Sequence, residues 1–381
     1  MAGTEADVAY VAGQAYAIRA LCYLNLATWF SRAPYNSLTG ASRWNEPCVP
    51  VYTTGTSIDT GGQPRESLRT VYGRIDQDID RAIELLEKAR ETTLAENNKS
   101  HINLYVALGI KSRACLAEGD WDGAFKAAKR VIDEGGYAVG TKSDLTGGMN
   151  SLDKQNVMWG AGIQVADQAG GYAGFFTHMD NKEGAYAKSA PKLISKQLYN
   201  RISATDIRRD WWDPSDKESP YVSKKFSFAN VASFLGDYIY MRVEEMYFTA
   251  AEAALRLDDL KSARELMNTV MAERDPGYSA NNRSGTLLGA TTTTWTGSFL
   301  ENILTHRRIE LWGEYGRLFG VRRLGQGIDR RTDDGFSEEC ISMMNRRNVN
   351  ITKADTYDWV LTIPKAELDA NPNINEEDQN P

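Results

Sequence analysis

Long segments of this 381-residue chain repeat their apolar residues with the period of an α-helix. From Glu66 to Arg90, apolar side chains form one stripe, and charged side chains such as Arg74, Asp78 and Arg81 form the opposite face. The segment from Val8 to Phe30 is apolar on nearly all sides, as expected of a helix inside a helical stack. The core must therefore be built mainly from packed helices.

Two helix pairs repeat a single plan, one over residues 103–134 and the other over residues 240–273. In the first pair, Gly119–Trp121 predicts a tight turn between the two helices. The second helix of each pair has a small residue near its start, Ala124 or Ala263, which lets two helices cross closely. These pairs are similar to tetratricopeptide repeats, so we predict a repeat-like helical scaffold.

The remaining segments are long and rich in Gly, Ser, Thr, Asn and Pro, a composition that favours ordered loops with binding surfaces. Residues 157–165 and 221–228 indicate short strands. We predict a mainly α fold in which one domain spans residues 1–381. Its helical scaffold is expected mainly at residues 7–31, 66–134, 238–274 and 298–320. Its loop-rich ligand lobe, which contains the few short strands, is expected mainly at residues 35–64, 140–236 and 276–297.

Composition excludes several functions. Lys and Arg number 44 against 51 Asp and Glu, so a basic track for nucleic acid is not expected. Three histidines and four dispersed cysteines without a CxxC pair argue against a zinc site, and we predict no metal and no cofactor. Cys22 and Cys115 lie in apolar helical runs and are predicted to be buried thiols.

The sequence also predicts no membrane-spanning helix, because none of its apolar stretches approaches the ~20 residues that a bilayer requires. A signal peptide is not expected either, since Glu5 and Asp7 closely follow Met1. These observations predict either a cytosolic protein or a chain that lacks its natural start.

Catalytic motifs are not evident in the sequence, which holds no Gly-x-Ser-x-Gly elbow, phosphate-binding loop or His-Glu-x-x-His pair. Paired carboxylates of a glycoside hydrolase remain an option, with Glu245 and Glu252 on one helix and Glu310 and Glu314 on another. Ion pairs inside the helical stack are the simpler interpretation. We therefore predict no enzyme, and we expect Glu245, Glu252 and Glu310 to pair with arginines such as Arg242, Arg307 or Arg308.

Aromatic residues give the strongest indication of a ligand site. A ring in a loop can stack on the apolar face of a sugar, while nearby polar side chains bind the hydroxyl groups. The candidate ligand residues lie in or beside the long loops and are Trp44, Tyr172, Phe175, His178, Asn181, Trp211, Trp212 and Asp213. The alternative is that each ring anchors its own loop. Because Pro214 disfavours helical geometry at Asp213, at least one of Trp211 and Trp212 is expected to be partly exposed.

The order of motifs along nearly the whole chain resembles the SusD/RagB family, surface glycan-binding lipoproteins of Bacteroidetes that work beside a TonB-dependent transporter. Residues 14–26 are similar to the Arg-Ala helix of that family. Tyr240–Ala253 is the most specific match, and Arg307–Arg317 is nearly as specific. Residues 361–368 and 379–381 are similar to the end of family members.

This resemblance implies a SusD-like fold and capture of an oligo- or polysaccharide, which is delivered to a TonB-dependent outer-membrane barrel without catalysis. It also implies a surface-exposed lipoprotein of the cell outer membrane. Family members carry an anchoring Cys and a further segment before the Arg-Ala helix, so we expect this chain to lack its lipid anchor and part of the usual ligand surface. Ligand residues vary within the family, so none is transferred here. The alternatives are a tetratricopeptide-type scaffold for protein interaction and, with less support, a helical glycoside hydrolase.

Overall fold

A computed structural model of the chain describes residues 3–381 except 58, 91, 93, 95–97, 167–172, 337, 339–351 and 354–355. Most of its regular structure is α-helix, which confirms the mainly α fold predicted from the sequence. The longer helices are α1 (Glu5–Phe30), α2 (Leu68–Lys88), α3 (Leu104–Glu118), α4 (Trp121–Glu134), α9 (Val243–Arg256), α10 (Leu260–Ala272), α11 (Phe299–Glu310) and α12 (Arg317–Leu324). The shorter helices are α5 (Lys142–Thr146), α6 (Phe175–Met179), α7 (Ala185–Ser189), α8 (Lys196–Tyr199) and α14 (Lys365–Ala370).

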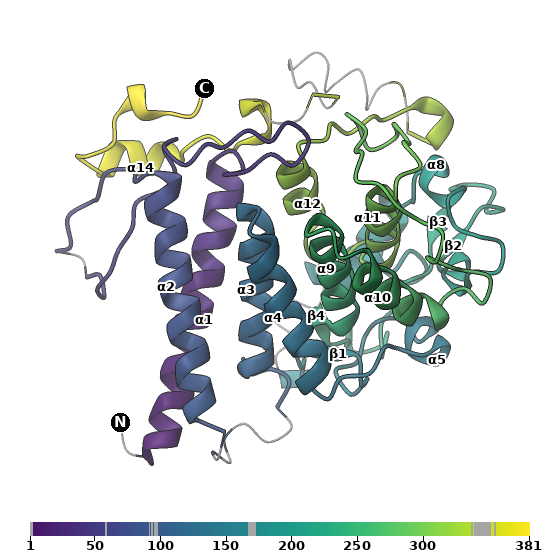
Figure 1. The fold of residues 1–381 in the computed structure, drawn as a ribbon, viewed down its shortest axis with the longest axis horizontal. Helices are drawn as coiled ribbons and strands as arrows, with labels where there is room; N and C mark the ends of the chain where they lie inside the picture. The colour runs from purple at the N-terminus through teal and green to yellow at the C-terminus, as the bar shows by residue number, and fades with distance from the viewer. Residues whose placement is uncertain are drawn as a thin grey trace.

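The longer helices form a stack in chain order (Figure 1). Helix α1 packs against α2, α2 against α3, α3 against α4, α4 against α9, and α9 against both α10 and α11. Helix α2 turns its apolar stripe, including Val71, Ile75 and Ile79, into the core. None of the helices in the described ranges is long and apolar enough to cross a membrane.

Local capping sets the helix boundaries of the first predicted pair. The side chain of Asn103 accepts hydrogen bonds from the N–H groups of Tyr105 and Val106, and so begins α3. Gly119 ends α3 in the left-handed region at φ 78°, which glycine adopts without steric cost. Asp120 then caps α4 by accepting from the N–H of Gly123. The tight turn predicted here is confirmed.

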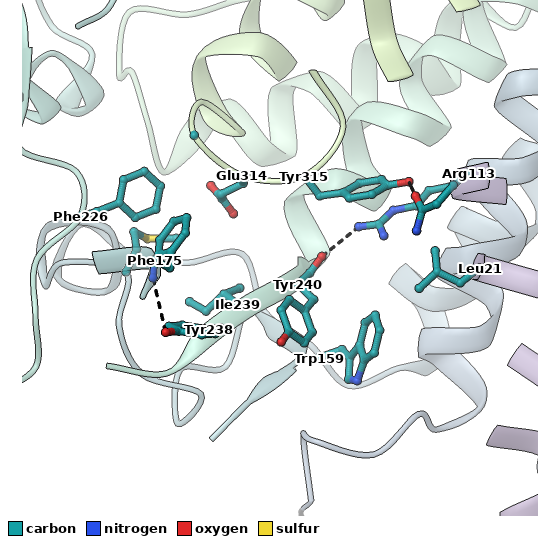
Figure 2. A pocket seen from close by; sticks show the side chains of 13 residues that line it. Leu21, Arg113, Trp159, Phe175, Phe226, Tyr238, Ile239, Tyr240, Glu314 and Tyr315 are labelled. Carbon is teal, nitrogen blue, oxygen red and sulfur yellow. Dashed lines mark hydrogen bonds between the residues drawn. The ribbon is translucent and has the colours of Figure 1, made fainter. Parts of the chain in front are cut away.

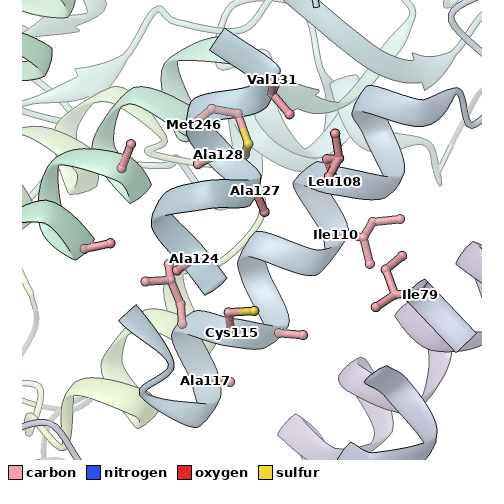
Figure 3. Close-up of a cluster of buried hydrophobic side chains, with 14 of the residues drawn as sticks. Ile79, Leu108, Ile110, Cys115, Ala117, Ala124, Ala127, Ala128, Val131 and Met246 are labelled. Carbon is pink, nitrogen blue, oxygen red and sulfur yellow. The ribbon is translucent and has the colours of Figure 1, made fainter. Parts of the chain in front are cut away.

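Small side chains allow the helices of the main core to approach closely (Figure 3). Ala124, Ala127 and Ala128 line α4, which packs between α3 and α9, and Met246 of α9 fills the space next to them. Ala263 of α10 is likewise fully buried. Cys115 is buried as predicted, but the prediction for Cys22 is wrong, because its position on α1 faces outward and is exposed.

Two small antiparallel sheets complete the fold: β1 (Val157–Ala161) pairs with β4 (Tyr238–Arg242), and β2 (Trp212–Asp213) pairs with β3 (Val222–Ser223). Both strands predicted from the sequence are therefore present but shorter. The helix predicted from Tyr240 begins at Val243 instead, because the preceding residues are extended and pair with β1.

The carboxyl-terminal residues lie across one end of α1 and α2 (Figure 1). Arg65 donates hydrogen bonds to the carbonyl of Asp378 at 2.6 Å and to the side chain of Asn380 at 2.8 Å. Asn380 in turn donates to the carbonyl of Phe30 at 2.9 Å. These contacts hold the carboxyl-terminal residues against the end of α1 and the segment just before α2.

Candidate functional site

The carboxylates that resembled a hydrolase pair are ion pairs of the helical stack, as predicted. Glu245 binds Arg113 at 2.7 Å and Arg307 at 3.0 Å. Glu252 binds Arg323 at 2.6 Å. All three contacts link different helices, so these residues hold α3, α9, α11 and α12 together.

Glu310 lies at the centre of a fully buried cluster with Arg208, Arg242 and Arg274, each at 3.0–3.1 Å. Burial alone would raise the pKa of Glu310, but the three guanidinium groups bring it well below its ordinary value. A carboxylate held ionised in this way neither accepts nor releases a proton near neutral pH. Arg308, the third arginine expected as a partner, is not part of the cluster.

Trp211 and Trp212 are both buried, at 2% and 1% exposure, so the prediction that one of them would be partly exposed is wrong. Trp211 is the last residue of a 3-10 helix, and Trp212 is the first residue of β2. Side chains alternate between the two faces of a strand, and this alternation therefore begins only after Trp211. This change of backbone geometry lets both rings enter a second cluster of buried hydrophobic residues, which includes Phe176, Leu198 and Phe226. The indole N–H of Trp211 donates to the carbonyl of Leu145 at 2.8 Å.

The other predicted ligand residues are dispersed. Trp44 packs edge-to-face on Tyr72 at 5.6 Å and anchors its loop to α2. His178 is exposed. The polar residues make local contacts, since Asn181 donates to the carbonyl of Ser223 at 2.8 Å and Asp213 accepts from Ser215. Tyr172 lies outside the described residues.

Of the candidate ligand residues in the described part of the chain, Phe175 lines a large pocket (Figure 2). We call it the junction pocket, because it lies between the helical stack and the loop-rich lobe. The pocket has a volume of about 460 Å³, within the ordinary range for ligand sites. It is lined by Leu21, Asn25, Arg113, Met149, Trp159, Phe175, Phe226, Tyr238, Ile239, Tyr240, Gly313, Glu314 and Tyr315.

Aromatic rings form one wall of the junction pocket. Trp159 of β1 and Tyr240 of β4 lie on paired strands, with ring centroids 5.0 Å apart at an angle of 66°. Tyr240 is 40% exposed and Trp159 is half-buried, so both present ring surface to a ligand. Phe175 and Phe226 continue this wall in an edge-to-face contact at 5.2 Å.

Polar groups from the helical stack form the opposite wall, and other protein groups hold each of them in place. The Arg113 guanidinium lies 3.9 Å from the centre of the Tyr315 ring and donates to the carbonyl of Tyr240 at 3.0 Å. The hydroxyl of Tyr315 donates to Asn25 at 3.1 Å. The site is therefore preorganised, with an amide and a phenol that can bind sugar hydroxyl groups.

Glu314 is the one carboxylate among the described residues that line the junction pocket. It binds Arg242 at 2.8 Å and Lys225. Although burial would raise the pKa of Glu314, these two cations lower it below its ordinary value. Glycoside hydrolysis uses two carboxyl groups across the scissile bond, and this wall offers one ionised group.

Sequence reasoning missed Trp159 and Tyr240. Both lie in segments predicted as regular structure and are not among the candidate ligand residues, whereas the pairing of β1 with β4 brings them together at a surface. The sequence predicts a strand at β1, and its one ring, Trp159, next to the small residues Gly160 and Ala161, was the signal that could have indicated an accessible aromatic surface.

The fold and the pocket together define a helical-repeat protein with an aromatic ligand pocket at the edge of its scaffold. Residues 180–381 match the SusD family, and the chain belongs to that family. No curated protein sequence matches it.

Several solved structures share the fold. A SusD-like carbohydrate-binding protein from Bacteroides vulgatus is 26% identical with a TM-score of 0.77, covering 99% of this chain and 79% of that one. A SusD superfamily protein from Bacteroides thetaiotaomicron is 23% identical, also with a TM-score of 0.77, covering 100% and 80%. A surface glycan-binding protein from Bacteroides uniformis is 17% identical with a TM-score of 0.67, covering 100% and 79%, and it shows likeness of fold alone.

Proposed function

We propose that this protein captures an oligo- or polysaccharide at the cell surface, without catalysis, and delivers it to a TonB-dependent outer-membrane transporter. The observation that carries the proposal is the Trp159–Tyr240 pair, whose accessible rings face polar groups across the junction pocket. Membership of the SusD family supports the choice of a glycan as the ligand.

The binding part is tested by isothermal titration with a panel of oligosaccharides, followed by product analysis of each mixture. We expect one glycan class to bind and to be recovered intact. Trp159→Ala and Tyr240→Ala should each weaken that binding about tenfold, or about 1.4 kcal/mol, because a stacking surface is lost. Trp29→Ala is the matched control, since Trp29 is 45% exposed and does not line the pocket.

Unchanged affinity in both pocket variants, each still melting cooperatively, would place the site elsewhere. His178→Ala then tests a remaining candidate, because His178 is exposed and lies outside the pocket, with Phe175→Ala as the pocket control. Recovery of shortened glycan would support the hydrolase alternative.

Delivery to a transporter is tested separately, by purifying the tagged protein from detergent-solubilised outer membranes. We expect a TonB-dependent barrel to copurify with the protein and to be identified by mass spectrometry. If no barrel copurifies, the delivery part of the proposal is wrong and the protein binds glycan without a transporter partner.

A further inference from the structure

A second pocket, with a volume of about 290 Å³, lies beside α11 and α12. Five arginines line it. Arg307 and Arg323 bind Glu245 and Glu252, respectively, and the other three are Arg308 on α11, Arg317 at the start of α12, and Arg330 after α12. Thr292 and Trp295, from the loop before α11, form part of its wall. We call this site the arginine pocket.

The arginines of this pocket lie close enough to affect one another. Burial and then the positive charge of Arg330 lower the pKa of Arg308 to about 10, with Asp334 acting in the opposite direction. Desolvation and then the charges of Arg308 and Arg330 act to lower the pKa of Arg317, although this residue is exposed. Such crowding of like charge is unfavourable unless an anion offsets it.

Pairing distinguishes Arg308 and Arg317 from other arginines of the protein, including Arg323 of the same pocket. Arg113 and Arg323 each bind a glutamate through two hydrogen bonds. Within the part of the chain that the structure describes, Arg308 and Arg317 form no ion pair. Arg308 donates to the carbonyl of Thr292 at 3.3 Å. A carboxylate does line the pocket, but Arg201 binds that residue, Glu301, at 2.6 Å.

Neutral donors accompany the positive charge. The hydroxyl of Thr292 is buried, the residue being 6% exposed, and it has no hydrogen-bond partner among the described residues. Helix α12 begins after Gly316 without a side-chain cap, and both Gly316 and Arg317 line the pocket. Uncapped N–H groups at a helix start favour an anion. An oxyanion bound here would meet guanidinium and backbone donors, and the Thr292 hydroxyl, unpartnered among the described residues, belongs to the same pocket lining.

Aromatic rings in the same wall point to the molecule that carries the oxyanion. Trp295 and Trp312 line the arginine pocket, and Gly313 and Tyr315 line both this pocket and the junction pocket. We propose that the arginine pocket binds the acidic group, a carboxylate or a sulfate ester, of a charged saccharide. The inference rests on the proposed function and deepens it by naming the class of glycan.

The test compares D-glucuronate and D-galacturonate with their methyl esters, which keep the sugar ring and remove the charge. Titrations at low ionic strength should show binding of the free acids and at least tenfold weaker binding of the esters. Arg308→Gln and Arg317→Gln should each weaken acid binding about tenfold, because one charge-assisted contact is lost. Arg81→Gln, at an exposed arginine of α2, is the matched control and should bind as the parent does.

The melting temperature without ligand separates a binding role of Arg317 from a structural one. Without ligand, Arg317→Gln should melt no lower than the parent, because it relieves crowding between like charges. Equal binding of acids and esters, binding of neither, or unchanged affinity in both variants would overturn the inference. Inorganic sulfate that competes as strongly as the acids would assign the pocket to a free oxyanion and overturn the saccharide part.

The two proposals fail differently. If Trp159→Ala and Tyr240→Ala weaken glycan binding while acids and methyl esters bind equally, the proposed function stands and the acidic class is wrong. If no glycan binds the parent protein at all, the proposed function itself fails.

Discussion

Glu252 shows at the level of one residue how the helical stack depends on paired charge. It is fully buried in α9 and binds Arg323 through both oxygens, at 2.8 and 2.6 Å. Glu252→Gln leaves Arg323 buried without its counter-charge, so we expect the free energy of unfolding to fall by about 3–5 kcal/mol. Denaturant unfolding measures the change, and glycan binding by the folded variant should be unaltered.

The matched control is Glu84→Gln on α2, where an exposed carboxylate contacts Lys88 and Arg81 in solvent. Such a pair contributes little, so its loss should leave the denaturation midpoint unchanged. A Glu252 variant as stable as this control would show that the buried pair is dispensable.

The pKa of Glu118, at the end of α3, predicts how the stability of the protein depends on pH. Burial, followed by the negative charges of Asp76 and Asp120, raises its pKa to about 9, with Lys111 acting against the shift. Between pH 4.5 and about 9 the folded state therefore keeps a proton that the unfolded state releases. The free energy of unfolding should fall as pH rises through this window.

Glu118→Gln removes that proton linkage. We expect the variant to gain stability relative to the parent as pH rises from 5 to 9, in denaturant titrations at each pH. Glu84→Gln serves again as control, because Lys88 and Arg81 lower the pKa of Glu84 to about 2, outside this range. Parallel pH profiles for the parent and Glu118→Gln would contradict the assignment.

At the level of elements, the contact between α1 and α2 depends on a glycine. A methyl group at Gly13 would lie 2.8 Å from Leu86 Cγ and 3.3 Å from the carbonyl oxygen of Ala82. Gly13→Ala should therefore lower the free energy of unfolding by about 1–3 kcal/mol through overpacking. Gly73→Ala on α2 has open space around it and should instead raise stability by about 0.5–1 kcal/mol, since alanine favours helix.

Thermal melts of the two variants give shifts of opposite sign if this packing is correct. A stabilised Gly13→Ala would mean that α1 and α2 separate more easily than their contacts indicate.

The junction between β4 and α9 shows where element boundaries escape prediction. The apolar and aromatic residues from Tyr238 onward fit a helix or a strand equally well by local pattern. Pairing of Tyr238–Arg242 with β1 selects the strand and delays the helix to Val243. That same pairing creates the aromatic wall of the junction pocket.

At the level of the whole molecule, function depends on segments far apart in the sequence. The junction pocket takes residues from α1, α3, β1, α6, β4 and the α11–α12 connection. Tyr315 and Asn25, which meet in that pocket, are 290 positions apart. The α11–α12 connection also borders the arginine pocket, so one short segment contributes to both candidate binding sites.

The sequence alone determined the helical class, the tight turn at Gly119–Trp121 and the pairing of buried glutamates with arginines. These features follow from local periodicity, from capping chemistry and from the cost of burying an unpaired charge. Their physical causes act within a few residues or apply to every buried carboxylate.

Tertiary structure decided which arginine meets which glutamate, which tryptophans are buried and where a ligand can enter. Trp211 and Trp212 lie in a polar, proline-containing stretch, yet a core formed by distant segments encloses both. Trp159 and Tyr240 lie in apolar runs, yet they remain accessible because their strands pair at an edge of the scaffold. Exposure is a property of the assembled surface, and residues that are hundreds of positions apart build that surface.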